Sequence, residues 1–170
     1  MSEITFIYES PLGPLTIKAL DKSISAVLFS KMSARQLIAD KVLETSTFNH
    51  PLIKECVQQL KDYFAGTRKR FDLPLVQPGT VFQQKVWNEL VKIEYGKTIS
   101  YLELSKRIGD VKAIRAVGTT NGKNQIAIIV PCHRVVGSNG DLTGYAGELW
   151  RKKWLLNHEA KFGNGVQTLF

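Results

Sequence analysis

Hydrophobic and polar residues alternate through the first thirty positions of the chain. Residues 4–8 and 15–20 have the two-residue repeat of half-buried strands, and a third apolar run covers residues 24–29. Turn-forming residues separate these runs, with Pro and Gly within residues 11–14 and Asp-Lys at residues 21–22. The pattern predicts a small antiparallel sheet.

The apolar spacing then changes to the three- and four-residue repeat of helices. A capping-box pattern at Ser33 predicts a short helix that ends near residue 43. Pro51 begins a second predicted helix, which Gly66 ends. Cys56 lies on or beside the apolar face of this helix, so we expect it to be a core residue.

A change of composition separates the two halves of the chain. Residues 73–79 contain two prolines and a glycine and have no apolar repeat, which is typical of a linker. We therefore predict an N-terminal domain over residues 1–75 and a C-terminal domain over residues 79–170. The expected fold class is α+β.

The C-terminal half begins with short amphipathic helices. Capping-box patterns start one helix at Thr80 and another at Ser100, and Gly109 ends the second. A three-residue turn then leads to a further short helix over residues 112–120. Two short helices around such a turn are a candidate helix-turn-helix, in which the second, carrying Arg115, would enter a DNA groove.

The remaining residues predict a strand, a hairpin and a final helix. Residues 126–130 are apolar and mostly β-branched, so we expect a buried strand. Residues 135–142 form a predicted hairpin with Asn-Gly at its tip, which would be the wing of a winged helix. Residues 148–159 predict a helix, and we expect its three consecutive basic residues, 151–153, to be exposed.

Charge is distributed unevenly over this pattern. The chain has 170 residues, of which 44% are hydrophobic and 22% charged, so its composition is that of a globular protein and not a disordered one. The net charge of +8 divides into +2 for residues 1–78 and +6 for residues 79–170. A basic C-terminal half favours an anionic partner such as a nucleic acid.

The cysteine and histidine content excludes several classes of protein. The chain has two cysteines, Cys56 and Cys132, and three histidines, which give neither a disulfide framework nor the paired spacing of a zinc site. The first residues lack the features of a signal peptide, and no apolar run approaches the ~20 residues that span a bilayer. We expect a cytoplasmic protein without metal and without membrane contact.

The candidate chemistry lies at Cys132 and His133, directly after Pro131 ends the predicted strand. A thiol beside an imidazole can act as a nucleophile when its thiolate is stabilised. From the residues alone, three alternatives stay open: a buried structural cysteine, a Cys–His hydrolase, and a non-catalytic winged-helix DNA-binding protein. A helix-turn-helix beside the thiol favours a nucleophile that acts on DNA.

Several motifs of the C-terminal half resemble those of O6-alkylguanine-DNA alkyltransferases, also called methylated-DNA–protein-cysteine methyltransferases. They are Pro-Cys-His-Arg-Val at 131–135, Tyr101 in Ile-Ser-Tyr, Arg115 in Arg-Ala-Val-Gly, Asn124, Gly-Tyr-Ala-Gly at 144–147 and Leu-Leu-Asn-His-Glu at 155–159. Residues 80–160 match strongly and residues 1–75 loosely. The resemblance implies an N-terminal α/β domain with an antiparallel, ribonuclease H-like sheet and a C-terminal winged helix-turn-helix domain.

The resemblance also implies an activity. Such proteins flip an alkylated base, O6-alkylguanine and also O4-alkylthymine, out of the DNA duplex and transfer the alkyl group irreversibly to their own cysteine. Each molecule acts once, and no cofactor takes part. The expected partner is double-stranded DNA that contains alkylated bases, and the expected state is a monomer.

Each site residue takes its role from its position in these motifs. The catalytic set is the alkyl acceptor Cys132, its base His133, the orienting carboxylate Glu159, the bracing Asn124 and the proton donor Tyr101. The residues implied to contact DNA are Arg115, which fills the place of the flipped base, and Tyr101, Ala116, Gly118 and Thr119. The implied base pocket contains Val135, Tyr145, Ala146 and Gly147.

Two features depart from the family pattern. Ala146 stands where some members have Ser, so one hydrogen bond to the O6 atom is expected from the backbone alone. Thr119 and Thr120 stand where Gly or Ala is common on the recognition helix, and their bulk could alter the fit to the groove. Arg134 is expected to be either structural or a phosphate contact.

Overall fold

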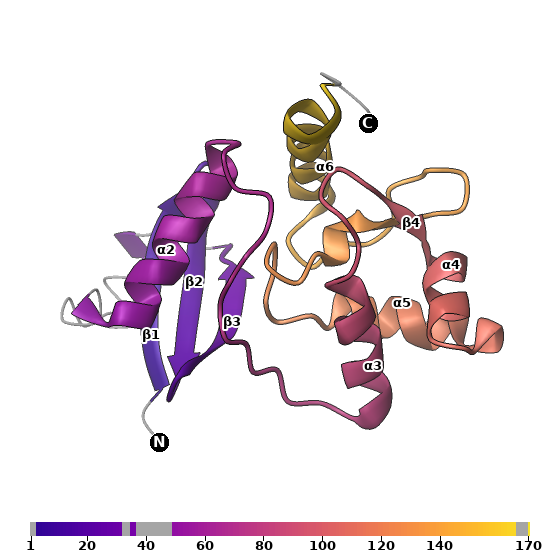
Figure 1. Cartoon of the computed structure of the whole chain (residues 1–170), viewed down its shortest axis with the longest axis horizontal. Coiled ribbons are helices and arrows are strands. Elements are labelled where there is room, and N and C mark those ends of the chain that lie inside the picture. Colours follow the sequence, from indigo (N-terminus) through magenta and orange to yellow (C-terminus); the bar gives the residue numbers. More distant parts are fainter. Residues whose placement is uncertain (1–2, 32–34, 37–48, 166–169) are drawn as a thin grey trace. The chain divides into compact units, whose positions relative to one another are not determined.

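The computed structural model describes residues 3–31, 35–36, 49–165 and 170, and it divides into two compact units, Met1–Gln77 and Pro78–Phe170 (Figure 1). The helix predicted from Ser33 to about residue 43 falls largely outside the described residues.

The first unit contains an antiparallel sheet of three strands. The strands are β1 (Glu3–Ser10), β2 (Gly13–Leu20) and β3 (Ser23–Phe29), in the order β1-β2-β3. The helix α2 (Pro51–Phe64) packs against this sheet (Figure 1). The predicted antiparallel sheet and the predicted helix at Pro51 are therefore confirmed.

The core of this unit follows from the alternation in its strands. Leu15, Ile17 and Ala19 of β2 are buried and alternate with half-buried residues, because successive side chains of a strand point to opposite faces. Cys56 on α2 is fully buried, and burial raises the pKa of its thiol to about 12. The prediction of Cys56 as a core residue is confirmed.

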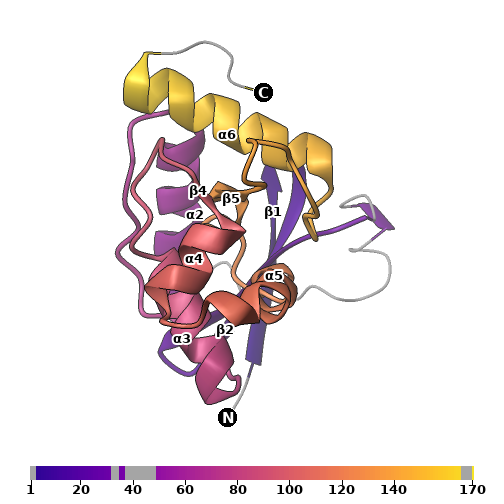
Figure 2. The same cartoon turned by 90° about the vertical axis from the view of Figure 1, so that its right-hand side faces the viewer.

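Three helices pack together in the second unit, as Figure 2 shows: α3 (Val81–Leu90), α4 (Tyr101–Arg107) and α5 (Ile114–Gly122). Thr80 and Gln83 form the predicted capping box of α3, and the Ser100 side chain accepts a hydrogen bond from the Glu103 N–H at the start of α4. Gly109, at a φ of +84°, follows α4, and a short 3-10 turn (Val111–Ala113) leads into α5. The two helices of the predicted helix-turn-helix are present.

Two predictions for the next segment are wrong. Residues 126–130 form a turn instead of a strand, because Ile128 adopts a φ of +70° and the Val130 N–H bonds to the Ile126 carbonyl at 3.0 Å. Residues 135–142 do not form a regular hairpin. Strand β5 (Val135–Val136) pairs in parallel with β4 (Ile99–Ser100), and only a turn closed by the Gly137 N–H and the Asp141 carbonyl follows it.

The last helix, α6 (Leu149–Asn164), is five residues longer than predicted at its C-terminal end. The expectation that residues 151–153 are exposed is wrong for Arg151 and Lys152, which are both buried. Lys152 lies on the same stripe of α6 as Leu155, Leu156 and Glu159, so the helix turns its ammonium group inward. In the described part of the chain, no helix has the length and apolarity required to cross a membrane.

Candidate active site

Cys132 begins a single 3-10 turn, Cys132–Arg134, between the 126–130 turn and strand β5. Pro131 precedes it, and the thiol-bearing residue is 6% exposed. Because β5 pairs with β4, and Ser100 of β4 is also the N-cap of α4, the cysteine turn is attached directly to the start of the helix-turn-helix. The local fold therefore holds a thiol beside a pair of packed helices.

The side chain of Asn124 organises the turn that presents the cysteine. Its amide nitrogen donates to the Val130 carbonyl at 2.9 Å, to the Ile126 carbonyl at 3.3 Å and to the Cys132 Sγ at 3.3 Å. Its amide oxygen accepts the Ile126 N–H at 3.1 Å. One buried amide thus joins both ends of the turn to the sulfur, and it explains how Ile128 is held in a conformation that is unusual for a β-branched residue.

The thiol of Cys132 is held in its neutral form. Burial raises its pKa, and the hydrogen bond from Asn124 and the positive charge of Lys152 offset part of that rise. Burial lowers the pKa of Lys152 to about 8, so the ammonium group is largely charged at neutral pH. A thiolate at this position would therefore form beside a buried cation and an amide donor.

His133 points to the carboxylate of Glu159 on α6, with 2.7 Å between its Nε2 and the Oε1 atom. Both residues are fully buried. Arg134 binds the same carboxylate with two further hydrogen bonds, 2.8 Å from Nε to Oε2 and 2.9 Å from Nη2 to Oε1. Glu159 therefore joins two consecutive residues of the cysteine turn to α6.

Opposing effects set the charge of this pair. Burial alone would raise the pKa of Glu159, but the charges and hydrogen bonds of His133 and Arg134 hold it well below its usual range. Burial lowers the pKa of His133 more than Glu159 raises it. The pair is thus a carboxylate and a neutral imidazole whose Nε2 carries the hydrogen, and the Nδ1 atom has no hydrogen-bond partner among the described residues.

The loop before α6 lies close to the first residue of α4. The Tyr101 hydroxyl donates to the Thr143 carbonyl at 3.3 Å, and the Lys152 ammonium group donates to the Thr143 carbonyl at 2.9 Å. The same ammonium group lies 5.9 Å from the centre of the Tyr101 ring. Tyr145 follows in this loop, and burial raises the pKa of its hydroxyl well above the ordinary value. Tyr101, Lys152 and the predicted pocket loop are thus brought together.

The exposed face of α5 carries the residues that the resemblance assigns to DNA. Arg115, Ala116 and Thr119 are exposed, whereas Gly118 is half-buried and an added Cβ there would lie 3.8 Å from the Tyr101 ring. Thr120 is buried, and its carbonyl accepts the Trp87 indole N–H at 3.0 Å. Only Thr119 of the two threonines therefore adds bulk to the surface.

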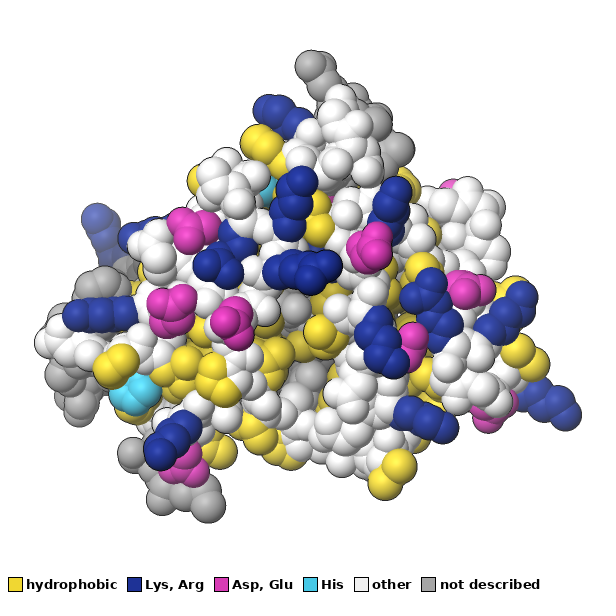
Figure 3. Space-filling view, in the orientation of Figure 1, with side chains coloured by type: hydrophobic (Ala, Val, Ile, Leu, Met, Phe, Trp, Pro, Cys, Tyr) yellow, Lys and Arg dark blue, Asp and Glu magenta, His cyan; other side chains and the backbone are white. Residues whose placement is uncertain are grey.

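The surface of this unit is basic, although less than the sequence suggests. Three of the thirteen cations of residues 79–170 are buried, as is one of the seven acidic residues, so the surface excess falls from six to four. Figure 3 shows Lys and Arg side chains over the regions of α4 and α6. The remaining excess still favours an anionic partner.

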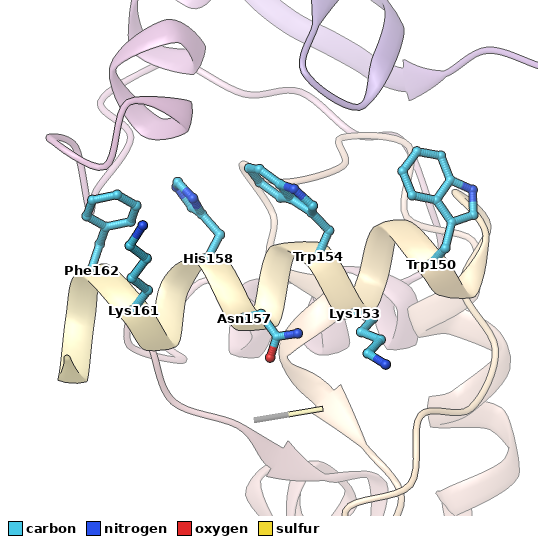
Figure 4. A pocket seen from close by; sticks show the side chains of 7 residues that line it. All are labelled: Trp150, Lys153, Trp154, Asn157, His158, Lys161 and Phe162. Atoms are coloured by element: carbon cyan, nitrogen blue, oxygen red, sulfur yellow. The ribbon is translucent and has the colours of Figure 1, made fainter. Parts of the chain in front are cut away.

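A separate groove runs along α6, and Figure 4 shows the side chains that line it. Aromatic residues recur every four positions along it: Trp150, Trp154, His158 and Phe162. The Trp154 and His158 rings stack, with 4.7 Å between their centroids. None of the residues that line the groove belongs to the predicted catalytic set. The described residues also contain no group of three or more His, Cys, Asp or Glu side chains that could hold a metal ion.

Sequence reasoning did not identify three polar residues of the site. Asn121 donates to the Cys132 carbonyl at 3.3 Å, Arg134 binds Glu159, and Lys152 lies near the thiol. The position of Lys152, seven residues before Glu159 on one helix, was a usable signal because such residues share a face. Arg134 gave no comparable signal beyond its adjacency to His133.

The fold joins a helix-turn-helix to a turn that holds a buried cysteine and a histidine–carboxylate pair. These features define a class of proteins with a candidate nucleophile beside a candidate DNA-binding surface. Residues 81–161 match the family described as 6-O-methylguanine DNA methyltransferase, DNA binding domain, and residues 5–77 match the ribonuclease-like domain of the same proteins. The chain belongs to the 6-O-methylguanine DNA methyltransferase family.

Individual relatives agree with this assignment. The methylated-DNA–protein-cysteine methyltransferase of Methanosarcina acetivorans is 46% identical over 153 residues, which cover 90% of this chain and 96% of the relative. The constitutive methylated-DNA–protein-cysteine methyltransferase of Bacillus subtilis is 45% identical over 152 residues, which cover 89% and 92%. The crystal structure of Mycobacterium tuberculosis OGT in complex with DNA is 41% identical, with a TM-score of 0.78 over 92% of each chain.

Proposed function

We propose that this protein repairs O6-alkylguanine in DNA by moving the alkyl group to the sulfur of Cys132. The observation that carries the proposal is the neutral, buried thiol of Cys132 next to the His133–Glu159 pair, within the part of the chain that matches the family's DNA-binding domain. The relatives named methylated-DNA–protein-cysteine methyltransferase support the same reaction.

The chemistry is a displacement at carbon by sulfur. The thiol proton passes, through a water molecule, to Nδ1 of His133, which has no hydrogen-bond partner among the described residues, and Glu159 stabilises the imidazolium that results. The new S–C bond forms as the O6–C bond breaks, and the Tyr101 hydroxyl protonates N3 of the departing guanine. His133 and Tyr101 then return to their starting states by proton exchange with water.

The reaction ends with a thioether on Cys132. A thioether offers no acyl or disulfide bond that water or a thiol could cleave under mild conditions, so the protein acts once. No oxyanion is formed, and the site accordingly needs no oxyanion hole. A soft sulfur nucleophile beside the cation of Lys152 fits this chemistry.

Access to the thiol requires that the base leaves the duplex, because a stacked base cannot meet a sulfur that is 6% exposed. In this proposal α5 enters the groove and Arg115, which is exposed on that helix, occupies the place of the flipped base. Val135, Tyr145, Ala146 and Gly147 line the base pocket, and O4-alkylthymine is a second substrate. The protein acts as a monomer.

A titration of repaired lesion against protein tests the proposal. Duplex DNA with a labelled O6-methyl group should transfer one equivalent of label per protein, and a Cys132→Ala variant should take up none. Repair of many lesions per protein, with the label released to water, would indicate a hydrolase, and binding without repair would indicate a non-catalytic DNA-binding protein. Either result would refute the proposed function.

The role of Arg115 has its own test. An Arg115→Ala variant should repair duplex DNA far more slowly but react normally with the free alkylated base, because only the duplex reaction needs base flipping. Lys123 provides a matched control, since it is an exposed cation just after α5. Equal slowing of both reactions in Arg115→Ala would exclude the flipping role.

A further inference from the structure

Arg134 is buried, and each donor nitrogen of its guanidinium group is engaged. Its Nε and Nη2 atoms bind the two oxygens of Glu159, and its Nη1 donates to the Ile93 carbonyl at 2.6 Å. The group also lies 5.7 Å from the centre of the Tyr95 ring. A side chain held in this way cannot reach a DNA phosphate, so the phosphate contact considered from the sequence is excluded.

The arrangement fixes the orientation of the Glu159 carboxylate. Oε1 accepts from both His133 Nε2 and Arg134 Nη2, at 2.7 and 2.9 Å. Oε2 accepts from Arg134 Nε at 2.8 Å and from the Gly96 N–H at 3.4 Å. A planar two-pronged contact of this kind holds a carboxylate in one plane more firmly than a single ammonium group could.

We propose that Arg134 is a positioning residue for the alkyl transfer: its two-pronged contact keeps Glu159 ionised and aligned with Nε2, so that His133 presents an unprotonated Nδ1 to the thiol. The inference rests on the proposed function, which gives His133 the role of the base. It assigns Arg134 two separable contributions. Its charge sets the protonation state of His133, and its fork geometry sets the direction of the imidazole ring.

The charge contribution follows from the groups that surround the imidazole. These are Glu159 and Lys152 of α6 and Arg134 of the cysteine turn, and Cys132 directly precedes His133 in the chain. With Arg134 present, its positive charge lowers the pKa of His133 and offsets part of the rise that Glu159 causes. Without the guanidinium charge, His133 would be the nearest cation available to a buried carboxylate, so its pKa should rise.

The experiment compares Arg134→Met, which removes the charge, with Arg134→Lys, which keeps the charge but not the fork. The rate of methyl transfer from O6-methylguanine DNA is measured as a function of pH. In Arg134→Met, the pH below which activity is lost should move upward by about one unit. In Arg134→Lys, that pH should stay in place while the maximal rate falls about tenfold, because only the alignment is lost.

A second pair of measurements separates this role from a structural one. Imidazole protonation of His133, followed by NMR in the protein without DNA, should show the same upward shift in Arg134→Met. The double variant Arg134→Met/Glu159→Gln, in which the carboxylate beside His133 is also removed, should bring the midpoint back down. Both readings are taken below the unfolding temperature of each variant, so that only folded protein contributes.

The outcomes are distinct. If neither variant moves the His133 midpoint or the pH profile, and rates fall only with the fraction of folded protein, Arg134 is structural and the proposal is refuted. If the unmodified protein transfers no methyl group, the proposed function fails, whereas the NMR titration still decides whether Arg134 controls His133. A midpoint that moves equally in Arg134→Lys and Arg134→Met would refute the division between charge and geometry.

Discussion

Replacement of Asn124 by Ala should both destabilise the protein and make Cys132 less reactive. The variant leaves the buried Ile126 N–H without its acceptor, at about 1–3 kcal/mol. The Ile126 and Val130 carbonyls each lose one hydrogen bond but keep a second, from the N–H groups of Val130 and Cys132. These smaller losses bring the expected decrease in the free energy of unfolding to about 3 kcal/mol.

The effect on the thiol has a separate cause. The Asn124 amide donates to the sulfur at 3.3 Å and lowers the thiol pKa against the effect of burial. Without that donor the pKa of Cys132 should rise further, so alkylation by iodoacetamide at neutral pH should slow. Cys56 does not interfere, because its thiol is fully buried with a pKa raised to about 12.

Asn121→Ala is the matched control. Asn121 also donates to Cys132, but through a single bond of 3.3 Å to the carbonyl oxygen. Its loss should cost about 1 kcal/mol or less and leave the thiol pKa nearly unchanged. Denaturant unfolding gives the stabilities, and the pH dependence of alkylation gives the pKa values. Equal losses in the two variants, with equal thiol pKa values, would refute the account of Asn124.

Three other results are expected. Gly109→Ala should lower the free energy of unfolding by about 1 kcal/mol, because Gly109 has a positive φ. Gly122→Ala in helix α5 should not lower it, since Gly122 does not have a positive φ and both sites have open space for a Cβ. Equal shifts of the unfolding temperature in the two variants would contradict this. Stability should fall as the pH drops from about 7 to 5 and again below about 5. The folded pKa values of His133 and Glu159 are both lowered, so the unfolded chain binds more protons than the folded protein in these two ranges. A Glu159→Gln variant should reduce the loss of stability below about pH 5, and an unchanged slope would be inconsistent with the lowered pKa of Glu159. Lys152→Met should slow the alkylation of the thiol at fixed pH, because a cation that favours the thiolate is lost; an unchanged rate would exclude that electrostatic role.

Local sequence signals predicted those elements whose stabilising contacts are themselves local. The strands β1, β2 and β3 follow from the two-residue alternation, and α3 and α4 begin at Thr80 and Ser100 because those side chains cap the following N–H groups. Cys132 and His133 were candidates from their position after the predicted strand, whereas Glu159 came from a motif resemblance, since nothing local brings residues 26 positions apart together.

The failures have a tertiary origin. Residues 126–130 have strand propensity, but the amide of Asn124 occupies their backbone groups and bends them into a turn with Ile128 at a positive φ. Lys152 was expected to be exposed because it is charged, although its spacing from Glu159 placed it on the buried stripe of α6. In both cases a buried polar contact outweighed a propensity that was correct on average.

Alkyl transfer to Cys132 is tested most directly by the mass of the protein after reaction with DNA that contains O6-methylguanine. The protein should gain the mass of one methylene group, located by peptide mapping on the peptide that contains Cys132 and absent after reaction with unmodified DNA. Removal of the lesion with no change in protein mass, or added mass on Cys56, would contradict alkyl transfer to Cys132.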